Sequence, residues 1–400
     1  MSYVPDIANA NRNVENGSTS MQGTDPDRAG GMTRDWSLRP LLGTGEGWPI
    51  LLLVLFACGA DPVTSSSDVD LAALFATATA AEIETVRTEW AGRDVEPDDI
   101  QVEGTEAFEL GTEPATLRVL SHAISGGRHY GAVVTANDAP PASLPVIVLA
   151  HGGDQGVSTT TLAQIASAIG DASAAFAWVV PSFRAEILTT TRGTFASGGE
   201  ASPWDRDVDD ALALLGAALA MTPQADAERI AVLGFSRGAG VGLLMGIRDS
   251  RIDRVVEFFG PTDFFDSFIR DVVEDALQGT LRDLPGLNVL NERFIQPLAE
   301  GSLTVAEVRR ELVRRSAVLF APDIPPLQIH HGTSDPVVAV SQAERLIEAL
   351  EALGRGSPDD GFFLYQGGLH NPLTLQGSVP RTLDFLEVLA APQLAGVGPR

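Results

Sequence analysis

The feature that most constrains the fold is a tight turn at Gly234–Gly238, which reads G-F-S-R-G. The mostly apolar residues 229–233 before it predict a short buried strand of a parallel sheet. Residues 239–245 after it are small and then apolar, which predicts a helix packed closely on that sheet. A strand that passes into a helix through so short a turn leaves little room for side chains, and glycines fit there. We therefore expect an α/β fold in which a helix N-terminus and the sheet edge present Ser236 to solvent.

A serine at such a turn can act as a nucleophile only with a base and with an acid that orients the base. The expected chain order in this kind of fold is serine, acid, histidine. Asp335 follows a predicted strand at 325–330, and His370 follows a predicted strand at 361–366. Because the carboxyl ends of parallel strands meet at one edge of a sheet, we expect Ser236, Asp335 and His370 to form a catalytic triad there.

The chain has six histidines, and the other five fit structural roles better. His330 and His331 lie in or at the end of a predicted strand, where they pack or hold the acid loop by hydrogen bonds. His122 and His129 precede the core motifs, and we expect them at the surface. His151 lies in a glycine-rich loop and is better placed as a hydrogen-bonding anchor of that loop than as a base.

That glycine-rich loop follows another strongly apolar strand, predicted at 145–150, and reads H-G-G from His151. Glycines let the backbone approach a substrate carbonyl group closely. In this arrangement one N–H donor comes from the loop and one from the residue after the nucleophile. We assign the backbone N–H groups of Gly153 and Arg237 to an oxyanion hole.

Together these motifs resemble those of the α/β-hydrolase superfamily, and more narrowly the prolyl oligopeptidase family's catalytic domain and dienelactone hydrolase-like proteins. The matching segments lie at 149–153, 179–184, 234–238, 331–338 and 368–370, within roughly residues 110–390. The resemblance implies the α/β-hydrolase fold, with a doubly wound, mostly parallel sheet, and a Ser-His-Asp hydrolase of esters or peptides. Peptidases of this family usually carry a large N-terminal β-propeller, for which this sequence has no room. The resemblance therefore favours an esterase-like hydrolase.

Two classes of function stay open at this point. The first is a serine hydrolase that cleaves carboxylic ester or related acyl bonds of small molecules through an acyl-enzyme, with a prolyl oligopeptidase-type peptidase as its variant. The second is a non-catalytic, lipid-anchored binding protein on the same fold, since a fold does not determine a function. The complete set of Ser236, Asp335 and His370 favours the hydrolase, because a decayed enzyme would tolerate the loss of any one of them.

Composition narrows the range of partners. The net charge is −26 and the chain contains no lysine. Such acidity argues against nucleic-acid binding and against adhesion to anionic lipid through a basic patch. The sequence has no H-x-x-x-H cluster and no G-x-G-x-x-G after a strand, so we expect no metal and no cofactor. Nothing in the sequence indicates an oligomeric state.

An apolar run at 48–57 has the length of a signal-peptide core and is too short to span a bilayer. Arg34 and Arg39 precede it. The run ends in L-F-A-C-G, which resembles a bacterial lipobox with Cys58 as the lipidated residue. Cys58 is the only cysteine, so the chain can form no intrachain disulfide, and lipidation would explain a single cysteine in an exported protein. We expect export to the cell envelope and membrane attachment through Cys58. The alternative is an apolar segment with an incidental cysteine.

The sequence therefore predicts five parts, with Met32 as a second candidate for the translation start. They are a disordered leader at 1–31, a signal peptide at 32–58, a flexible tether at 59–68, an α/β-hydrolase domain at 69–392 and a tail at 393–400. Within the domain, about sixty residues separate two predicted core strands, which exceeds a normal connection. We expect a helical cap at about 261–322. Its apolar stripe from Phe264 to Leu277 either packs on the domain or lines an acyl pocket.

Apolar strands and amphipathic helices alternate through the rest of the domain. We predict an antiparallel pair at 116–124 and 128–135, and core strands at 145–150, 176–180, 229–234, 254–259, 325–330 and 361–366. We predict helices at 70–89, 205–221, 341–353 and 378–389. The third of these helices is expected to begin with a capping box between Ser341 and Glu344.

Overall fold

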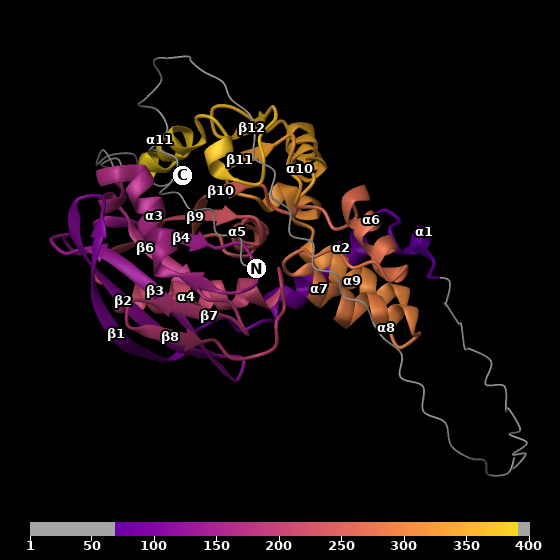
Figure 1. The fold of residues 1–400 in the computed structure, drawn as a ribbon, viewed down its shortest axis with the longest axis horizontal. Helices are drawn as coiled ribbons and strands as arrows, with labels where there is room; N and C mark the ends of the chain where they lie inside the picture. Colours follow the sequence, from indigo (N-terminus) through magenta and orange to yellow (C-terminus); the bar gives the residue numbers. More distant parts are fainter. Residues whose placement is uncertain (1–68, 391–400) are drawn as a thin grey trace, which may run out of the picture. The chain divides into compact units, whose positions relative to one another are not determined.

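The computed structural model describes residues 69–390, which are built around a nine-stranded sheet (Figure 1). In spatial order its strands are β1 (Asp98–Leu110), β2 (Glu113–Ile124), β3 (Gly127–Ala136), β6 (Ala177–Pro181), β4 (Leu144–Ala150), β9 (Ala225–Phe235), β10 (Ile252–Phe258), β11 (Leu327–Gly332) and β12 (Gly361–Tyr365). Pairing is antiparallel from β1 to β6 and parallel from β6 to β12. The predicted core strands are confirmed. The predicted leader, signal peptide, Cys58 and tether lie outside the described residues.

Helices pack on both faces of this sheet, and the side chains of β4 alternate between them. Val146 and Val148 belong to one hydrophobic cluster, while Ile147 and Leu149 belong to another. The first cluster includes α4 (Arg206–Met221), α5 (Arg237–Arg248) and α10 (Ser341–Ala352), and the second includes α3 (Thr159–Ile169) and α11 (Ser378–Ala390). A strand buried on both sides explains the continuous apolar run in its sequence. No helix within residues 69–390 is long and apolar enough to cross a membrane.

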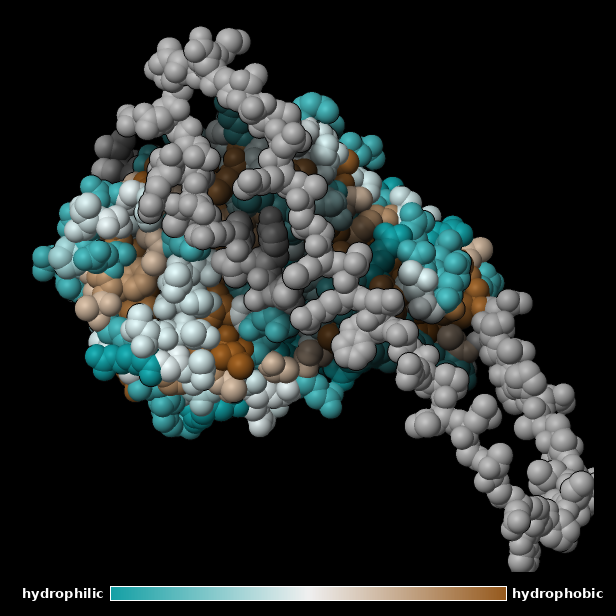
Figure 2. Space-filling model, in the orientation of Figure 1, coloured by the Kyte–Doolittle hydropathy of each residue, from teal (hydrophilic) through white to brown (hydrophobic). Residues whose placement is uncertain are grey.

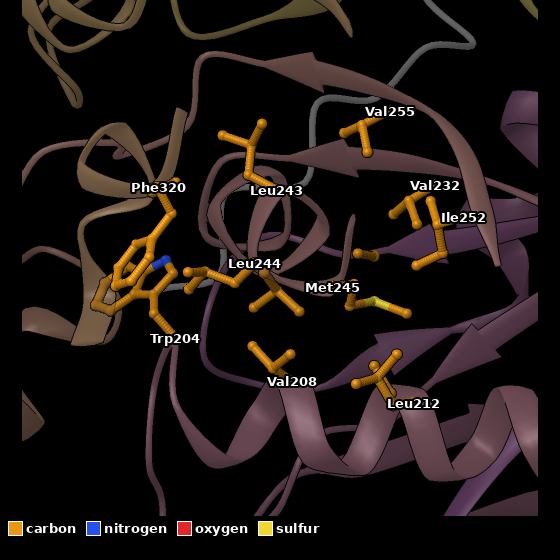
Figure 3. Close-up of a cluster of buried hydrophobic side chains, with 14 of the residues drawn as sticks. Trp204, Val208, Leu212, Val232, Leu243, Leu244, Met245, Ile252, Val255 and Phe320 are labelled. Atoms are coloured by element: carbon orange, nitrogen blue, oxygen red, sulfur yellow. The ribbon is translucent and has the colours of Figure 1, made fainter. Parts of the chain in front are cut away.

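The helix that follows the tight turn, α5, lies in the middle of the first cluster (Figure 3). Leu243, Leu244 and Met245 fill the space between sheet residues such as Val232 and residues of α4 such as Val208. All five side chains are almost completely buried. Fully burying a side chain of this kind stabilises the fold by about 1.5–3 kcal/mol. The start of α5 is therefore anchored by the core of the domain.

A helical insertion joins β10 to β11. It contains α6 (Ser267–Leu277), α7 (Leu287–Leu290), a π-helical turn (Asn291–Ile295), α8 (Gln296–Ala299), α9 (Val305–Arg315) and a 3-10 segment (Ala317–Asp323). A small second sheet is formed by β5 (Val157–Ser158), β7 (Ile187–Thr190) and β8 (Gly193–Ala196). Figure 1 shows the inserted helices beside the N-terminal helices α1 (Leu71–Leu74) and α2 (Ala80–Ala91). Arg309 joins the two groups, because its guanidinium donates to the Leu74 carbonyl and pairs with Glu82.

Three local predictions are wrong. The single N-terminal helix expected at 70–89 is two helices, α1 and α2. The break occurs because Thr79 starts a new helix, with a capping box to Glu82. The capping box expected at the start of α10 is absent as well. The helix begins after Val340 without a side-chain cap, and Ser341 donates its hydroxyl to Asp266 at 2.6 Å instead.

The third error concerns His122 and His129, which were expected at the surface and are each only 1 % exposed. They face each other across β2 and β3, with ring centroids 5.9 Å apart, and His129 lies 3.6 Å from Asp210 of α4. Burial lowers the pKa of both histidines to about 4. They are therefore neutral core residues at neutral pH.

Candidate active site

Ser236 occupies the sharp turn between β9 and α5. Its backbone has φ 53° and ψ −122°, a sparsely populated conformation for a residue with a Cβ. Such a conformation costs on the order of 1–3 kcal/mol and persists only where the surroundings enforce it. Here the Ser236 N–H donates to the Phe258 carbonyl at 2.9 Å, and the Ala239 N–H donates to the Ser236 carbonyl at 2.9 Å. The half-buried serine is thus held at the N-terminus of a twelve-residue helix.

Two glycines let the backbone pack closely around this serine. A Cβ atom on Gly238 would lie 2.1 Å from the Ala150 carbonyl oxygen, which no side chain tolerates. The start of α5 therefore lies directly against the end of β4. A Cβ atom on Gly152 would lie 3.0 Å from the Cβ of Ser236. The glycine-rich loop after β4 is consequently in immediate contact with the candidate nucleophile.

Asp335 and His370 form a hydrogen-bonded pair at the same sheet edge. The distance between His370 Nδ1 and Asp335 Oδ2 is 2.7 Å. The other carboxylate oxygen accepts from the backbone N–H groups of Val337 and Val338, at 2.8 and 3.0 Å. The Asp335 side chain has no exposed surface and that of His370 is 17 % exposed. Because the carboxylate accepts a hydrogen bond from Nδ1–H, the neutral imidazole keeps Nε2 as its basic nitrogen.

The loops that carry the acid and the base are tied to each other. The Ser334 N–H donates to the Gly368 carbonyl at 2.9 Å, and the Gly367 N–H donates to the Thr333 hydroxyl at 2.9 Å. One loop follows β11 and the other follows β12, and these strands are paired in parallel. The pairing of the strands therefore places the two loops side by side, and these hydrogen bonds fix their relative position.

The end of β10 connects the serine to the histidine. Phe258 accepts the hydrogen bond from Ser236, and the ring of the next residue, Phe259, lies 4.2 Å from the His370 ring between centroids. Within residues 69–390 the Ser236 hydroxyl makes no hydrogen bond. Contacts between a nucleophile and its base are often long in a free enzyme and tighten with substrate. The structure thus brings Ser236, Asp335 and His370 to one edge of the sheet.

The two predicted oxyanion donors also lie at this edge. Arg237 is the first residue of α5, so its N–H has no partner inside the helix. Gly153 lies on the loop that touches Ser236. Within the described residues neither N–H donates to a protein acceptor. Both groups are therefore available to a negatively charged oxygen beside Ser236.

A small pocket opens beside Ser236 and is mostly apolar. It is lined by Trp204, Ser236, Arg237, Pro261, Phe268, Ile269, Leu284, Pro285, Leu287, Val337 and Val338. The cavity that these side chains leave free is about 20 Å³, room for roughly one water molecule. Phe268 and Ile269 belong to the apolar stripe of the insertion, whereas Phe264 of the same stripe is buried against Trp204. The stripe therefore does both: one part packs on the domain and another lines the pocket.

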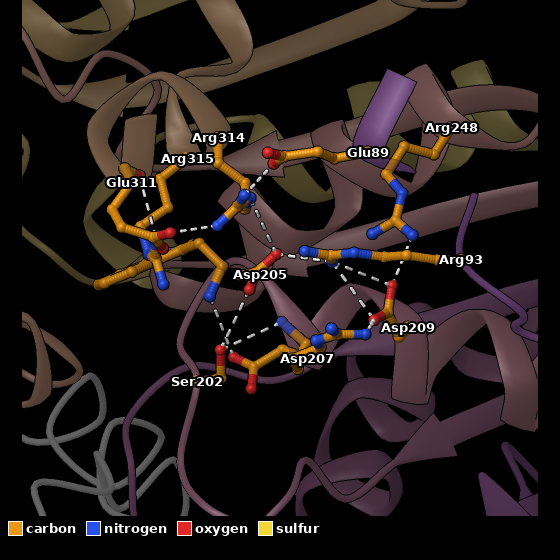
Figure 4. Close-up of polar contacts among 12 residues, drawn as sticks. Glu89, Arg93, Ser202, Asp205, Asp207, Asp209, Arg248, Glu311, Arg314 and Arg315 are labelled. Atoms are coloured by element: carbon orange, nitrogen blue, oxygen red, sulfur yellow. Dashed lines mark hydrogen bonds and ion pairs between the residues drawn. The ribbon is translucent and has the colours of Figure 1, made fainter. Parts of the chain in front are cut away.

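Buried ion pairs fix the segment that carries Trp204 (Figure 4). Asp205 pairs with Arg93 at 2.6 Å, and Asp209 pairs with Arg248 at 2.5 Å. Arg315 of α9 donates to the Pro203 carbonyl at 2.9 Å. These contacts come from α9, α5 and the segment after α2, so they hold one wall of the pocket from several sides. Trp204 had no signal in the sequence that could have marked it as a pocket residue.

The remaining histidines after the turn have the structural roles that their strand position predicted. His330 is buried, with Nδ1 2.7 Å from the Tyr365 hydroxyl and Nε2 2.8 Å from Gln328 Oε1. Burial lowers its pKa to about 3. His331 donates from Nε2 to the Val338 carbonyl at 3.0 Å, which supports the loop around Asp335. No cluster of three or more histidine, cysteine or acidic side chains suited to a metal occurs in the part of the chain that the structure describes.

Charged and polar residues cover much of the face in Figure 2, and the hydrophobic residues visible there lie in separate patches. Two exposed leucines flank the candidate base: Leu369 is 45 % exposed and Leu373 is 53 % exposed. The Leu369 N–H donates to the Thr374 hydroxyl at 2.9 Å, which holds this segment in place. The surface beside His370 is therefore apolar in part.

Comparison with known proteins gives structural matches only. No protein-family model and no curated protein matches the sequence. The fold is similar to an acetyl xylan esterase from a Thermoanaerobacterium species (18 % identity, TM-score 0.52), covering 78 % of this chain and 93 % of the esterase. An acetyl xylan esterase from a Paenibacillus species gives 20 % identity and a TM-score of 0.51, covering 76 % of this chain and 92 % of that one.

A puromycin-hydrolyzing peptidase of Mycobacterium tuberculosis gives 19 % identity and a TM-score of 0.50, covering 74 % of this chain but only 47 % of the peptidase. Together with the parallel sheet and the strand–turn–helix at Ser236, these matches show that the chain has the α/β-hydrolase fold. At this level of identity the likeness concerns the fold alone.

Proposed function

We propose that this chain is a serine hydrolase that cleaves carboxylic esters, or related acyl bonds, of small molecules. The observation that carries the proposal is the strained backbone of Ser236, at φ 53°, on a turn whose sheet edge also holds the Asp335–His370 pair. Strain of this kind clusters at active sites, where the surrounding structure enforces it. The acetyl xylan esterases and the puromycin-hydrolyzing peptidase share the fold, which supports acyl hydrolysis as the reaction class.

In the first step Ser236 Oγ attacks the ester carbonyl carbon while His370 Nε2 takes the hydroxyl proton. The buried Asp335 carboxylate holds Nδ1–H and stabilises the imidazolium that forms. The former carbonyl oxygen becomes negative and is stabilised by the N–H groups of Gly153 and Arg237. The imidazolium then gives its proton to the departing alkoxide, which leaves as an alcohol. The acyl group remains as an ester on Ser236.

In the second step the same groups act on water. His370 Nε2 takes a proton from a water molecule, whose oxygen attacks the acyl carbon. The oxyanion donors stabilise the second tetrahedral intermediate. Its collapse breaks the bond to Ser236 Oγ, which regains a proton from the imidazolium, and the carboxylic acid leaves. The two steps together consume one ester and one water molecule and release one alcohol and one carboxylic acid, and the enzyme returns to its starting state.

The dimensions of the pocket favour a short acyl group. Phe268, Ile269 and Leu287 close the apolar pocket next to Ser236, and its cavity is only about 20 Å³. An apolar lining favours the acyl part of an ester over a charged amino-acid residue. The two esterases are matched over more than nine-tenths of their length, whereas the peptidase is matched over 47 %. We therefore favour a short-chain esterase, with peptidase activity as the second candidate.

A panel of purified substrates tests this choice: p-nitrophenyl acetate, butyrate and octanoate, with aminoacyl-naphthylamides alongside. We expect the highest kcat/KM with acetate, and at least about a 10-fold lower value with octanoate, because the extra methylenes do not fit the pocket. Phe268→Ala should narrow that ratio, since it enlarges the pocket without touching Ser236, Asp335 or His370. Faster cleavage of the naphthylamides would favour the peptidase. No turnover and no reaction with a fluorophosphonate would favour a non-catalytic binding protein.

We also propose that the chain is exported and attached to a membrane of the cell envelope through lipid on Cys58. The support is the sequence alone: an apolar run of signal-peptide length ends at the only cysteine, in a lipobox-like context. A single acyl chain gives weak and reversible membrane binding, so stable anchoring needs more than one chain. The hydrolase domain would then act on substrates outside the cytoplasm.

Cys58→Ser tests the anchor. The native protein should partition with membranes and be released by detergent, because acyl chains hold it there. The variant should move to the soluble fraction or remain an unprocessed precursor, and its hydrolase domain should keep its activity. Mass spectrometry of the mature N-terminus provides the decisive measurement. A mature chain that begins elsewhere and carries no acyl mass would rule out lipidation, although export by an ordinary signal peptide would still be possible.

A further inference from the structure

Behind the candidate oxyanion hole lies a buried polar network that the sequence did not indicate. The Arg237 side chain is 2 % exposed and extends away from the turn into the domain. Its guanidinium pairs with Asp207 of α4, with Nε–Oδ2 at 2.8 Å, and with Glu186. The same guanidinium donates from Nη1 to the Gly153 carbonyl at 3.1 Å. The residue after the nucleophile therefore touches the oxyanion loop with its side chain.

His151 extends this network to the neighbouring peptide. Its Nε2 lies 3.4 Å from Glu186 Oε2, and its Nδ1 lies 3.0 Å from the Gly152 carbonyl oxygen. Phe183 contacts both side chains. The His151 ring stacks on the Phe183 ring with centroids 4.5 Å apart, and the Arg237 guanidinium lies 5.1 Å from the Phe183 ring centroid. Each of these side chains is buried, so none is free to adopt other rotamers.

Peptide geometry links these contacts to the oxyanion donor. The Gly152 carbonyl and the Gly153 N–H belong to one planar trans peptide and point in opposite directions. His151 holds the carbonyl end, so it also sets the direction of the Gly153 N–H. Arg237 holds the carbonyl of the next peptide. Both peptide planes that flank the Gly153 Cα are therefore fixed by side chains, although this glycine has few conformational limits of its own.

We propose that Arg237, Glu186 and His151 form a positioning relay that aims the Gly153 N–H at the oxyanion, so that Arg237 supplies one oxyanion donor and orients the other. This inference rests on the proposed serine hydrolase activity. The three side chains are positioning residues, since their polar contacts are with the oxyanion loop, with Asp207 and with each other. A misplacement of about 1 Å in a catalytic group can cost about 100-fold in rate, which sets the size of the expected effect.

The relay also fixes where one proton lies. His151 Nδ1 must donate, because the Gly152 carbonyl can only accept. A neutral imidazole then carries its lone pair at Nε2, which lies 3.4 Å from Glu186 Oε2 and makes no hydrogen bond within the described residues. Burial lowers the pKa of His151 to about 4. His151 is therefore neutral at neutral pH, with its one proton on Nδ1.

Two substitutions of Glu186 test whether its hydrogen bond from Arg237 orients the loop. A glutamine at this position keeps an oxygen that can accept from Arg237 and keeps the shape of the side chain, whereas alanine loses both. Glu186→Gln should therefore keep most of the kcat that Glu186→Ala loses, and we expect Glu186→Ala to lower kcat about 30–100-fold with KM within about 3-fold. If Glu186→Gln is as damaging as Glu186→Ala, the hydrogen bond from Arg237 does not account for the role of Glu186.

Arg237→Lys tests the guanidinium itself. Lysine keeps a positive charge for Asp207, but it lacks the planar fork that reaches Glu186 and the Gly153 carbonyl together. We expect kcat to fall about 100-fold with KM nearly unchanged, because the oxyanion is stabilised only in the transition state. The matched control is Arg229→Lys, in the half of β9 away from Ser236. The Arg229 guanidinium pairs with Asp226 at 2.7 Å and donates to the Leu389 carbonyl at 2.7 Å, without touching the loop. The kcat of Arg229→Lys should stay within about 3-fold of the original value.

Hydrogen exchange of the free protein separates the relay from the proposed function. Amide exchange across residues 151–158 should speed up at least about 10-fold in Arg237→Lys and Glu186→Ala, and not in Arg229→Lys. Wild-type exchange rates and kcat in Arg237→Lys would overturn the relay. If the native protein neither hydrolyses esters nor reacts with a fluorophosphonate, the proposed function fails, while the exchange measurement still decides whether these side chains fix the loop.

Discussion

Ser236→Ala should abolish labelling by a fluorophosphonate and lower kcat by about 10⁵–10⁶-fold. The reason is chemical: the variant has no oxygen to form the acyl bond, while the oxyanion donors and the pocket remain. Alanine keeps a Cβ at φ 53°, so it neither relieves nor adds backbone strain, and the melting temperature should change little. Mass spectrometry of the labelled protein, together with initial rates on p-nitrophenyl acetate, provides the measurement.

A serine elsewhere on the domain serves as the control. Ser302 lies on an exposed turn of the insertion and its hydroxyl makes no hydrogen bond within the described residues. Ser302→Ala should keep both labelling and rate. Retained labelling in Ser236→Ala would mean that another serine is the nucleophile, and the strained turn would then need a different explanation.

The parts of the site that follow strands could be predicted from the sequence. The segments before Asp335 and His370 are short, contain several apolar residues and are each followed by a glycine-containing loop, so the strand ends can be located in the sequence. In a parallel sheet the loops after such strands meet at one edge, and this is where the structure places both residues. The prediction needed only the strand ends and their direction, which are local properties of the sequence.

The relay could not be predicted in the same way. Glu186 and Asp207 are charged residues in unremarkable surroundings, and nothing local indicates that they are buried. Their pairing with Arg237 depends on the packing of α4 and α5, over 51 residues of sequence in the case of Glu186. Buried ion pairs are a product of tertiary structure. The same holds for His122 and His129, whose burial follows from strand pairing and from α4 rather than from their neighbours in sequence.

The N-terminal helices show a different kind of error, because a local signal was present. Thr79 and Glu82 have the spacing of a capping box and mark the start of α2. The prediction of a single helix over 70–89 did not take that signal into account. At Ser341 the capping pattern is present in the sequence, but no capping box forms, because the hydroxyl donates to Asp266 instead. Capping patterns are therefore informative only when tertiary partners do not compete for the side chain.

Asp335→Asn and His370→Ala should each lower kcat by about 10⁴-fold or more. Asparagine in place of Asp335 can present an N–H to His370 Nδ1, which favours the wrong tautomer and removes the charge that stabilises the imidazolium. Alanine in place of His370 removes the base itself. Because these groups act as a unit with Ser236, combining either change with Ser236→Ala should cost little more than Ser236→Ala alone.

His331→Ala is the matched comparison for this pair. His331 is fully buried, lies 3.6 Å from Asp335 and donates to the Val338 carbonyl at 3.0 Å, so it contacts the acid loop without holding the base. Its removal should lower the free energy of unfolding by about 1–3 kcal/mol through the unpaired carbonyl, and should lower kcat by less than about 10-fold. Chemical denaturation and initial rates measure the two effects separately. An indispensable His331 with a dispensable His370 would show that the base had been assigned to the wrong histidine.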